Sequence, residues 1–146
     1  MRYRVALFGL LLSLPALAMA DEPSETDLKA AYCIEAVRIE LSALRSGIGR
    51  GQKLDRQISE AEDRLNRLQG YLSPRVKNLD ASGLATESKR AEVDAAQEIE
   101  QFTNPDPAHR CRIDDTTVAC YEKLKSGVDP DVESRRRGCI KLEWLP

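Results

Sequence analysis

The sequence predicts an all-α protein: a long, coiled-coil-like antiparallel helical hairpin, a third helix, and a C-terminal cap of short helices stapled by disulfides. Charged residues make up 32% of the 146 residues and aromatic residues 5%, which is typical of long solvated helices and not of a sheet sandwich. Two long stretches carry apolar residues at spacings of three and four, the period of one helix face. The chain also has four cysteines behind an export signal, the usual setting for disulfides in a small domain.

The first twenty residues have the three parts of a secretory signal peptide. Arg2 and Arg4 form a basic start, residues 5–17 are an apolar run, and residues 18–20 form a small-x-small cleavage box. We therefore expect cleavage after Ala20, which leaves 126 residues in the periplasm or outside the cell. The apolar run is shorter than the roughly 20 residues that a bilayer span needs. No second run follows, so we expect no transmembrane segment in the mature chain.

The mature chain divides at residues 104–107, Asn-Pro-Asp-Pro, where two prolines stop a helix. We predict that residues 21–103 form the hairpin and the third helix. Residues 104–146 hold three of the four cysteines, and we predict that they form a cap packed on the hairpin.

The first predicted helix covers residues 27–46, a stretch without glycine or proline. Apolar residues lie on two of its faces, one containing Val37 and Leu41 and the other containing Tyr32 and Ala36. A helix that is apolar on two sides needs two partners. We therefore expect this helix to be the central one.

The second predicted helix covers residues 52–72 and follows a short glycine-rich connection, residues 47–51, which favours an antiparallel hairpin. It carries a strict heptad seam: Leu54, Ile58, Ala61, Leu65, Leu68 and Leu72. We interpret the seam as packing on the first helix of the same chain. The alternative is pairing with another copy or another protein, so Leu54, Ile58, Leu65 and Leu68 are candidate interaction residues.

A third helix is predicted from about residue 84 to 102, after Ser73-Pro74 ends the second. We expect it to pack across the hairpin through an alanine-rich arc: Ala85, Ala91, Ala95, Ala96, Ile99 and Phe102. Two short helices are predicted in the cap, one capped by Thr116 or Thr117 and one beginning at Asp129-Pro130. The terminal Leu142, Trp144 and Leu145 are expected to dock as an apolar tail.

The four cysteines, Cys33, Cys111, Cys120 and Cys139, allow three pairings, and the sequence does not decide among them. Cys33 lies far from the others, so any pairing of all four ties the cap back to the first helix. We favour Cys111 with Cys120 as a local clamp and Cys33 with Cys139 as a long tie. The chief alternative joins Cys33 to Cys111 and Cys120 to Cys139.

No group of residues has the spacing of a catalytic or metal site. His109 is the only histidine, and nearby Cys111 is expected to be oxidised and therefore unable to act as a nucleophile. The Asp114-Asp115 pair lacks the alternating ligands and central glycine of a calcium loop. The cysteines are too widely spaced for zinc. We therefore predict no enzyme activity, no metal and no cofactor.

The charge balance gives no reason to expect nucleic acid, because the mature chain has 20 basic and 24 acidic residues. The densest basic patch is Arg135, Arg136 and Arg137. We interpret it as the solvated end of a helix whose dipole favours cations, with contact to an acidic partner as the alternative.

These observations predict a small, exported, non-enzymatic interaction or accessory protein of a bacterial-type envelope. It would bind an unknown protein partner, or a second copy of itself, through the hairpin surface. The alternative is a binder of a small ligand, or an inhibitor of an envelope enzyme, that uses a cleft between the hairpin and the cap near His109 or Arg135.

Overall fold

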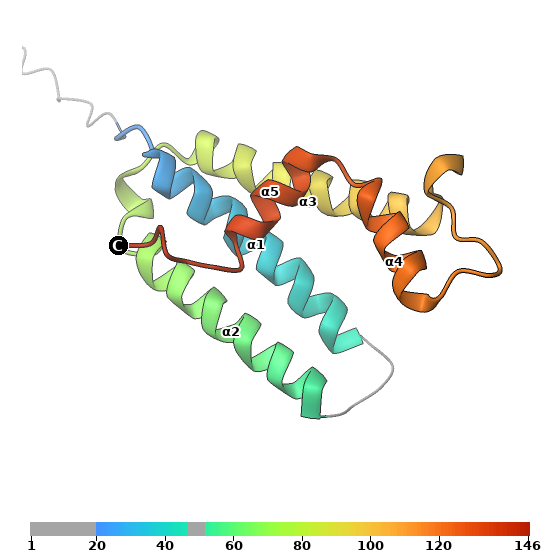
Figure 1. The fold of residues 1–146 in the computed structure, drawn as a ribbon. Helices are drawn as coiled ribbons and strands as arrows, with labels where there is room; N and C mark the ends of the chain where they lie inside the picture. The colour runs from blue at the N-terminus through green and yellow to red at the C-terminus, as the bar shows by residue number, and fades with distance from the viewer. Residues whose placement is uncertain (1–19, 47–51) are drawn as a thin grey trace, which may run out of the picture.

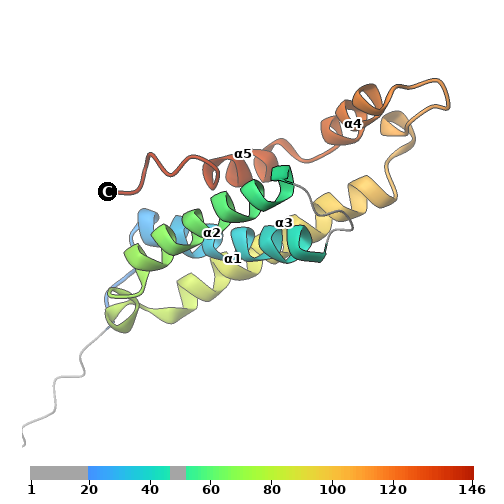
Figure 2. The same ribbon diagram turned by 90° about the horizontal axis from the view of Figure 1, so that it is seen from below.

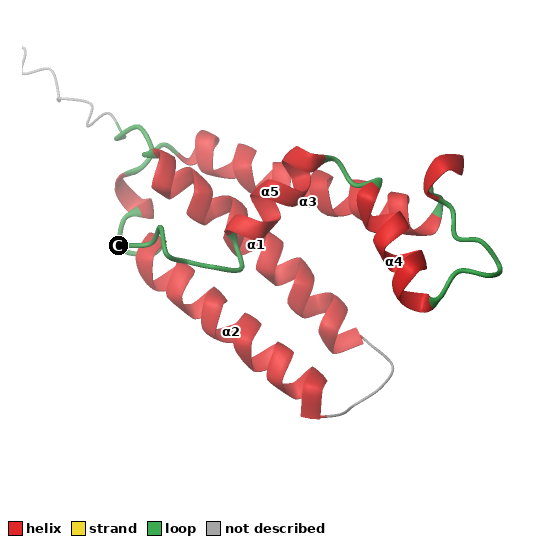
Figure 3. Cartoon of the chain, viewed as in Figure 1, coloured by secondary structure: helices red, strands yellow, loops and turns green. Residues whose placement is uncertain are grey.

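The structure, a computed structural model, describes residues 20–46 and 52–146. The predicted signal peptide, apart from Ala20, and the glycine-rich connection lie outside the described residues. The described chain forms five α-helices: α1 (Glu25–Ser46), α2 (Gln52–Leu72), α3 (Ala81–Thr103), α4 (Thr117–Ser126) and α5 (Pro130–Gly138). Two 3₁₀ turns, η1 (Val76–Asn78) and η2 (Pro107–His109), lie between them. Within these ranges there is no β-strand (Figure 3), so the all-α prediction is confirmed.

Helix α1 is the centre of the molecule. It packs against α2 on one side and α3 on the other, as both views show (Figures 1 and 2). Ala30 and Cys33 are fully buried, and Val37 and Leu41 nearly so. The prediction that two partners cover this helix is therefore confirmed. The N-terminal half of the helix buries three small residues, Ala30, Ala31 and Cys33.

The heptad seam of α2 faces α1 within the same chain. Leu68 is fully buried, as is Ala61, and Ile58 and Leu65 pack against the core as half-buried side chains. Leu54, at the far end of the seam, is also half-buried. The helical hairpin is thus formed by an internal seam, as interpreted from the sequence.

Helix α3 begins three residues earlier than predicted. Asp80 caps it by accepting a hydrogen bond from the backbone N–H of Ser82 at 3.2 Å. Before it, Asp21 joins the turn between α2 and α3, donating its N–H to Asn78 O at 2.7 Å and accepting from Asp80 N–H at 2.8 Å. The first residue of the predicted mature chain is therefore built into the fold.

The predicted apolar arc of α3 is partly wrong. Its buried residues are Leu84, Ala91 and Asp94, whereas Ala85, Ala96 and Ile99 are exposed. The helix is rotated from the predicted arc, so that Asp94 faces the protein interior together with Leu84 and Ala91. A search for apolar periodicity misses this orientation, because one of the buried residues is charged.

The two helices of the cap contact different parts of the protein (Figure 1). Helix α5 contacts α1, while α4 extends along the C-terminal end of α3 and has no buried residue. The tail docks as predicted: Leu142 is buried, and Trp144 Nε1 donates to Gly138 O at 2.8 Å. The ammonium group of Lys29 lies 4.6 Å from the Trp144 ring centroid. None of the helices described is long and apolar enough to cross a membrane.

Candidate interaction site

Two disulfides fix the cap, and they follow the favoured pairing. Cys33 is bonded to Cys139, and Cys111 to Cys120, with Cα–Cα distances of 5.2 and 4.9 Å. Both distances lie in the ordinary range for disulfides. The alternative pairing is excluded. The first bond ties α5 to the middle of α1, and the second closes a short loop before α4.

A buried carboxylate reinforces the first attachment. Asp94 on α3 accepts two hydrogen bonds from the guanidinium of Arg135 on α5, Nε to Oδ2 at 2.7 Å and Nη2 to Oδ1 at 2.9 Å. The hydroxyl of Tyr32 on α1 donates to the same carboxylate at 2.7 Å. Asp94 and Tyr32 are each only 3% exposed. One carboxylate therefore joins three helices through charge-assisted bonds, which are the strong kind.

The electrostatics of this triad favour the charged pair. Burial raises the pKa of Asp94, but the hydrogen bonds from Arg135 and Tyr32 outweigh burial and hold it below its usual range. Burial, with the bond to Asp94, raises the pKa of Tyr32. The bond to Asp94 also raises the pKa of Arg135. Arg135 is thus engaged inward and is not the solvated residue that the sequence suggested.

A second buried carboxylate, Asp27, lies in the first turn of α1. Asp27 accepts bonds from Arg75 Nε at 2.8 Å, from Tyr71 Oη at 3.0 Å and from the Ser24 hydroxyl at 2.7 Å. The hydrogen bond from Arg75 lowers the pKa of Asp27 far below its usual range, and the bonds from Ser24 and Tyr71 act in the same direction against burial. Asp27 also takes part in the cap of α1, where its own N–H donates to the Ser24 hydroxyl at 3.2 Å. Its carboxylate therefore both supports this cap and ties the end of α2 to the start of α1.

A cleft lies between the hairpin and the cap. Its volume is about 410 Å³, within the range of ligand sites. We call it the cap cleft. It is lined by side chains of all five helices and of the segments that flank α5: Ala36, Val37, Glu40, Gln57, Glu60, Arg64, Glu98, Phe102, Tyr121, Lys125, Val128, Glu133, Arg136, Arg137, Cys139 and Ile140.

Most charged side chains of the cap cleft are paired with one another. Arg64 bonds to Glu40 at 2.8 Å, and Arg136 pairs with Glu98. Glu133 is shared: Arg137 Nη2 lies 2.8 Å from its Oε1 and Lys125 Nζ lies 3.6 Å from the same atom. The bond from Arg137 lowers the pKa of Glu133.

This sharing leaves two cations around one carboxylate. The part of the cap cleft next to α4 and α5 therefore carries a local positive excess. The rest of the lining is neutral or apolar, apart from the Arg64–Glu40 pair and Glu60, whose partner Arg56 lies outside the lining.

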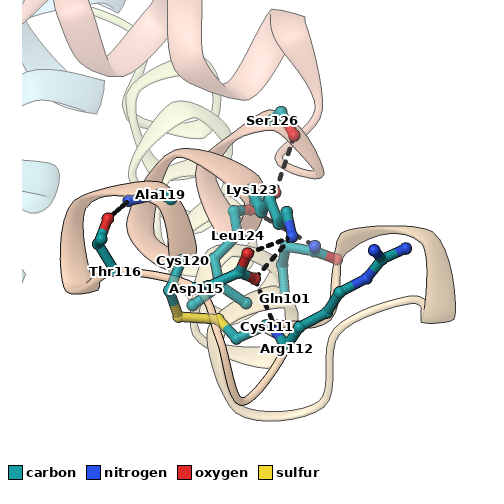
Figure 4. Close-up of a disulfide and its surroundings, with 10 residues drawn as sticks. All are labelled: Gln101, Cys111, Arg112, Asp115, Thr116, Ala119, Cys120, Lys123, Leu124 and Ser126. Atoms are coloured by element: carbon teal, nitrogen blue, oxygen red, sulfur yellow. Dashed lines mark hydrogen bonds and ion pairs between the residues drawn. A yellow bond between two sulfur atoms is a disulfide. The ribbon is translucent and has the colours of Figure 1, made fainter.

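The second disulfide closes residues 111–120, which we call the cystine loop (Figure 4). Its first four residues after Cys111 form a turn in which Asp115 N–H donates to Arg112 O at 3.1 Å. The Asp115 carboxylate accepts from Arg112 N–H at 2.7 Å and from Lys123 Nζ at 2.6 Å. The Thr116 hydroxyl caps α4 by accepting from Ala119 N–H. The Asp114-Asp115 pair is thus a turn and cap, as interpreted, and the part of the chain that the structure describes has no cluster of three metal-ligating side chains.

The structure separates the predicted interaction residues into two groups. The seam residues Leu54, Ile58, Leu65 and Leu68 lie together on α2, toward α1. Of the three arginines, Arg136 and Arg137 line the cap cleft and Arg135 does not. His109 lies in η2, half-buried, with its ring against Gly127: a Cβ added there would lie 3.0 Å from His109 Cγ.

Sequence reasoning missed the two buried carboxylates and the apolar wall of the cap cleft. Asp27 lies three and four residues before the buried Ala30 and Ala31, and Asp94 lies three residues after the buried Ala91. A search for apolar periodicity discards both positions because they are charged. Ile140 and Tyr121 are large apolar residues with 62% and 51% exposure. Nothing in their local sequence distinguishes them from core residues.

No family model matches the chain, and comparison with curated proteins and with solved structures gives no significant match. The function therefore has to be argued from the geometry described above.

Proposed function

We propose that the chain is a small, exported, non-enzymatic interaction protein that binds a polypeptide segment in the cap cleft. The observation that carries this proposal is the lining of the cleft, where apolar side chains alternate with paired charges. A polypeptide segment offers the same mixture of apolar side chains, charges and backbone polar groups. The export signal in residues 1–20 and the two disulfides support an oxidising compartment such as the periplasm.

The cap cleft supports this role better than the seam of α2. Leu68 of the seam is already buried against α1, whereas Ile140 and Tyr121 of the cleft remain exposed. Exposed aromatic and aliphatic side chains beside a concavity are the usual anchors of protein interfaces. We therefore place the interaction surface between the hairpin and the cap.

Rigid support of the cleft also favours binding. Its α5 wall is held by the Cys33–Cys139 bond and by the Arg135–Asp94 pair. A pre-organised surface loses little conformational entropy when a partner binds.

The second candidate function is binding of a small ligand in the same cleft. Its volume favours this reading. The lining extends over side chains of all five helices, which an extended segment can contact more fully than a small ligand, so we regard a polypeptide as the better occupant.

Selection of displayed random peptides on the folded, oxidised protein tests the proposal. We expect enriched peptides to bind at least about tenfold more weakly to Ile140→Asp, which places a charge in the apolar wall. They should bind normally to Val93→Asp, a matched control at an exposed valine of α3 outside the cleft.

Failure to enrich any peptide, or equal binding by both variants, would contradict the proposal. Small-molecule fragments whose NMR shift changes cluster at the cleft, without peptide binding, would favour the second candidate.

A further inference from the structure

The cystine loop presents an isoleucine to solvent in a fixed position. Ile113 is fully exposed, and Asp114 beside it is exposed too. Single exposed apolar residues are common on protein surfaces. Ile113 differs because it stands at the centre of a turn that is closed covalently and by hydrogen bonds.

The constraints on this turn are independent of one another. The Cys111–Cys120 bond closes its ends, and Asp115 bonds both to the backbone of Arg112 and to Lys123 of α4 (Figure 4). α4 is in turn held to α3 by Gln101, which donates to Leu124 O at 3.4 Å, and by the Phe102–Tyr121 rings. The turn therefore loses little conformational entropy when Ile113 binds in a pocket on another molecule.

The cap cleft has the features that such a turn would need. Val37 and Val128 are buried at the cleft, and Ile140 leaves apolar surface open to solvent. Next to them stand Lys125 and Arg137, the two cations that share Glu133. An apolar surface beside excess positive charge is complementary to an isoleucine followed by an aspartate.

We propose that the cystine loop of one copy docks in the cap cleft of a second copy. Ile113 would contact the apolar wall at Ile140, and the Asp114 carboxylate would lie near Lys125 and Arg137. This inference rests on the proposed function, because it names the polypeptide segment that the cleft binds. The contact joins two different surfaces. Two copies can make it reciprocally in a closed twofold dimer, or one-way contacts can extend to further copies.

Sedimentation velocity of the oxidised protein, over about 1 to 500 µM, tests the inference. We expect concentration-dependent self-association of the unaltered chain. Ile113→Ser removes the anchor, and Ile140→Asp places a negative charge where Asp114 approaches. Each variant should raise the dissociation constant at least about tenfold, while Val93→Asp should leave it unchanged.

Mixing the two defective variants gives a sharper test. Ile113→Ser retains an intact cleft and Ile140→Asp retains an intact loop, so one of the two possible contacts is restored in the mixture. We expect the equimolar mixture to contain a species of two chains that neither variant forms alone. Circular dichroism of each variant confirms that it is folded.

Three results would overturn the inference. These are a monomer throughout the concentration range, loss of association in only one of the two variants, and a mixture that behaves as its separate components. If the protein is monomeric but displayed peptides still bind in an Ile140-dependent manner, the proposed function stands and only the second copy as partner is wrong.

Discussion

Removing the Cys33–Cys139 bond should destabilise the protein about twice as much as removing the Cys111–Cys120 bond. The first bond joins residues 106 apart and the second joins residues 9 apart. In the chain-entropy model, a cross-link closing these loops stabilises the fold by about 4.8 and about 2.6 kcal/mol at 25 °C. The comparison uses two double variants, Cys33→Ala/Cys139→Ala and Cys111→Ala/Cys120→Ala.

Differences in packing should further increase the difference in free energy of unfolding between the two double variants. Cys33 is fully buried and Cys139 is 3% exposed, whereas Cys111 is exposed. Loss of the buried sulfur atoms leaves a small cavity in the core. The short bond, by contrast, is attached at Cys120 to α4, which has no buried residue and contributes little to the cooperative core.

Urea denaturation followed by circular dichroism at 222 nm measures both losses, with the unaltered oxidised protein as reference. We expect free energies of unfolding that differ by at least about 2 kcal/mol between the double variants. Equal losses, or a larger loss from the Cys111–Cys120 pair, would refute the argument that α5 is the attachment on which the cap depends.

Three further predictions concern substitutions of buried side chains. Asp94→Ala should lower the free energy of unfolding, measured by urea denaturation, by about 3 kcal/mol. This is the low end for breaking a buried ion pair, because Arg135 keeps partial access to water. A loss below about 1 kcal/mol would contradict the stabilising role of the triad. The folded-state pKa of Asp27 is lowered from its ordinary value of about 3.8. The ionised carboxylate therefore contributes fully to the free energy of unfolding at pH values above about 4, and this contribution is lost as the pH falls below that value. Asp27→Asn should therefore show a weaker loss of stability between pH 5 and 2 than the unaltered chain. Leu68→Ala should cost about 2–5 kcal/mol, against less than about 0.5 kcal/mol for the exposed Ile99→Ala; similar costs would mean that the α2 seam is not the core.

The helical skeleton was predictable because its signals are local and periodic. The seam from Leu54 to Leu72 repeats without interruption. Prolines and glycines mark most helix ends, although Gly70 and Gly83 lie inside helices. The favoured disulfide pairing, with a local clamp and a long tie, is the one that the structure shows. These inferences need only the spacing of residues along the chain.

The orientation of α3 and the residues that line the cap cleft could not be predicted in this way, and neither His109 nor Arg135 is among that lining. Asp94 is buried because Arg135, 41 residues later, reaches it, and no local pattern encodes that meeting. Likewise, Arg136 lines the cleft only because the Cys33–Cys139 disulfide holds α5 against α1. The candidate site is assembled from residues whose proximity depends on the long disulfide, so it becomes visible only in three dimensions.

The two disulfides also have different consequences for the order in which the chain oxidises. Cys33 must remain a thiol until a residue 106 positions later is available, whereas Cys111 finds Cys120 within nine residues. Short loops close much faster than long ones, so the short bond removes two competing thiols before Cys139 meets Cys33. Only one pairing then remains. The Cys111–Cys120 bond, which contributes less to equilibrium stability, thus keeps its two cysteines from pairing wrongly with Cys33. In Cys120→Ser, Cys111 remains a free thiol, so we expect it to form a non-native disulfide with Cys33.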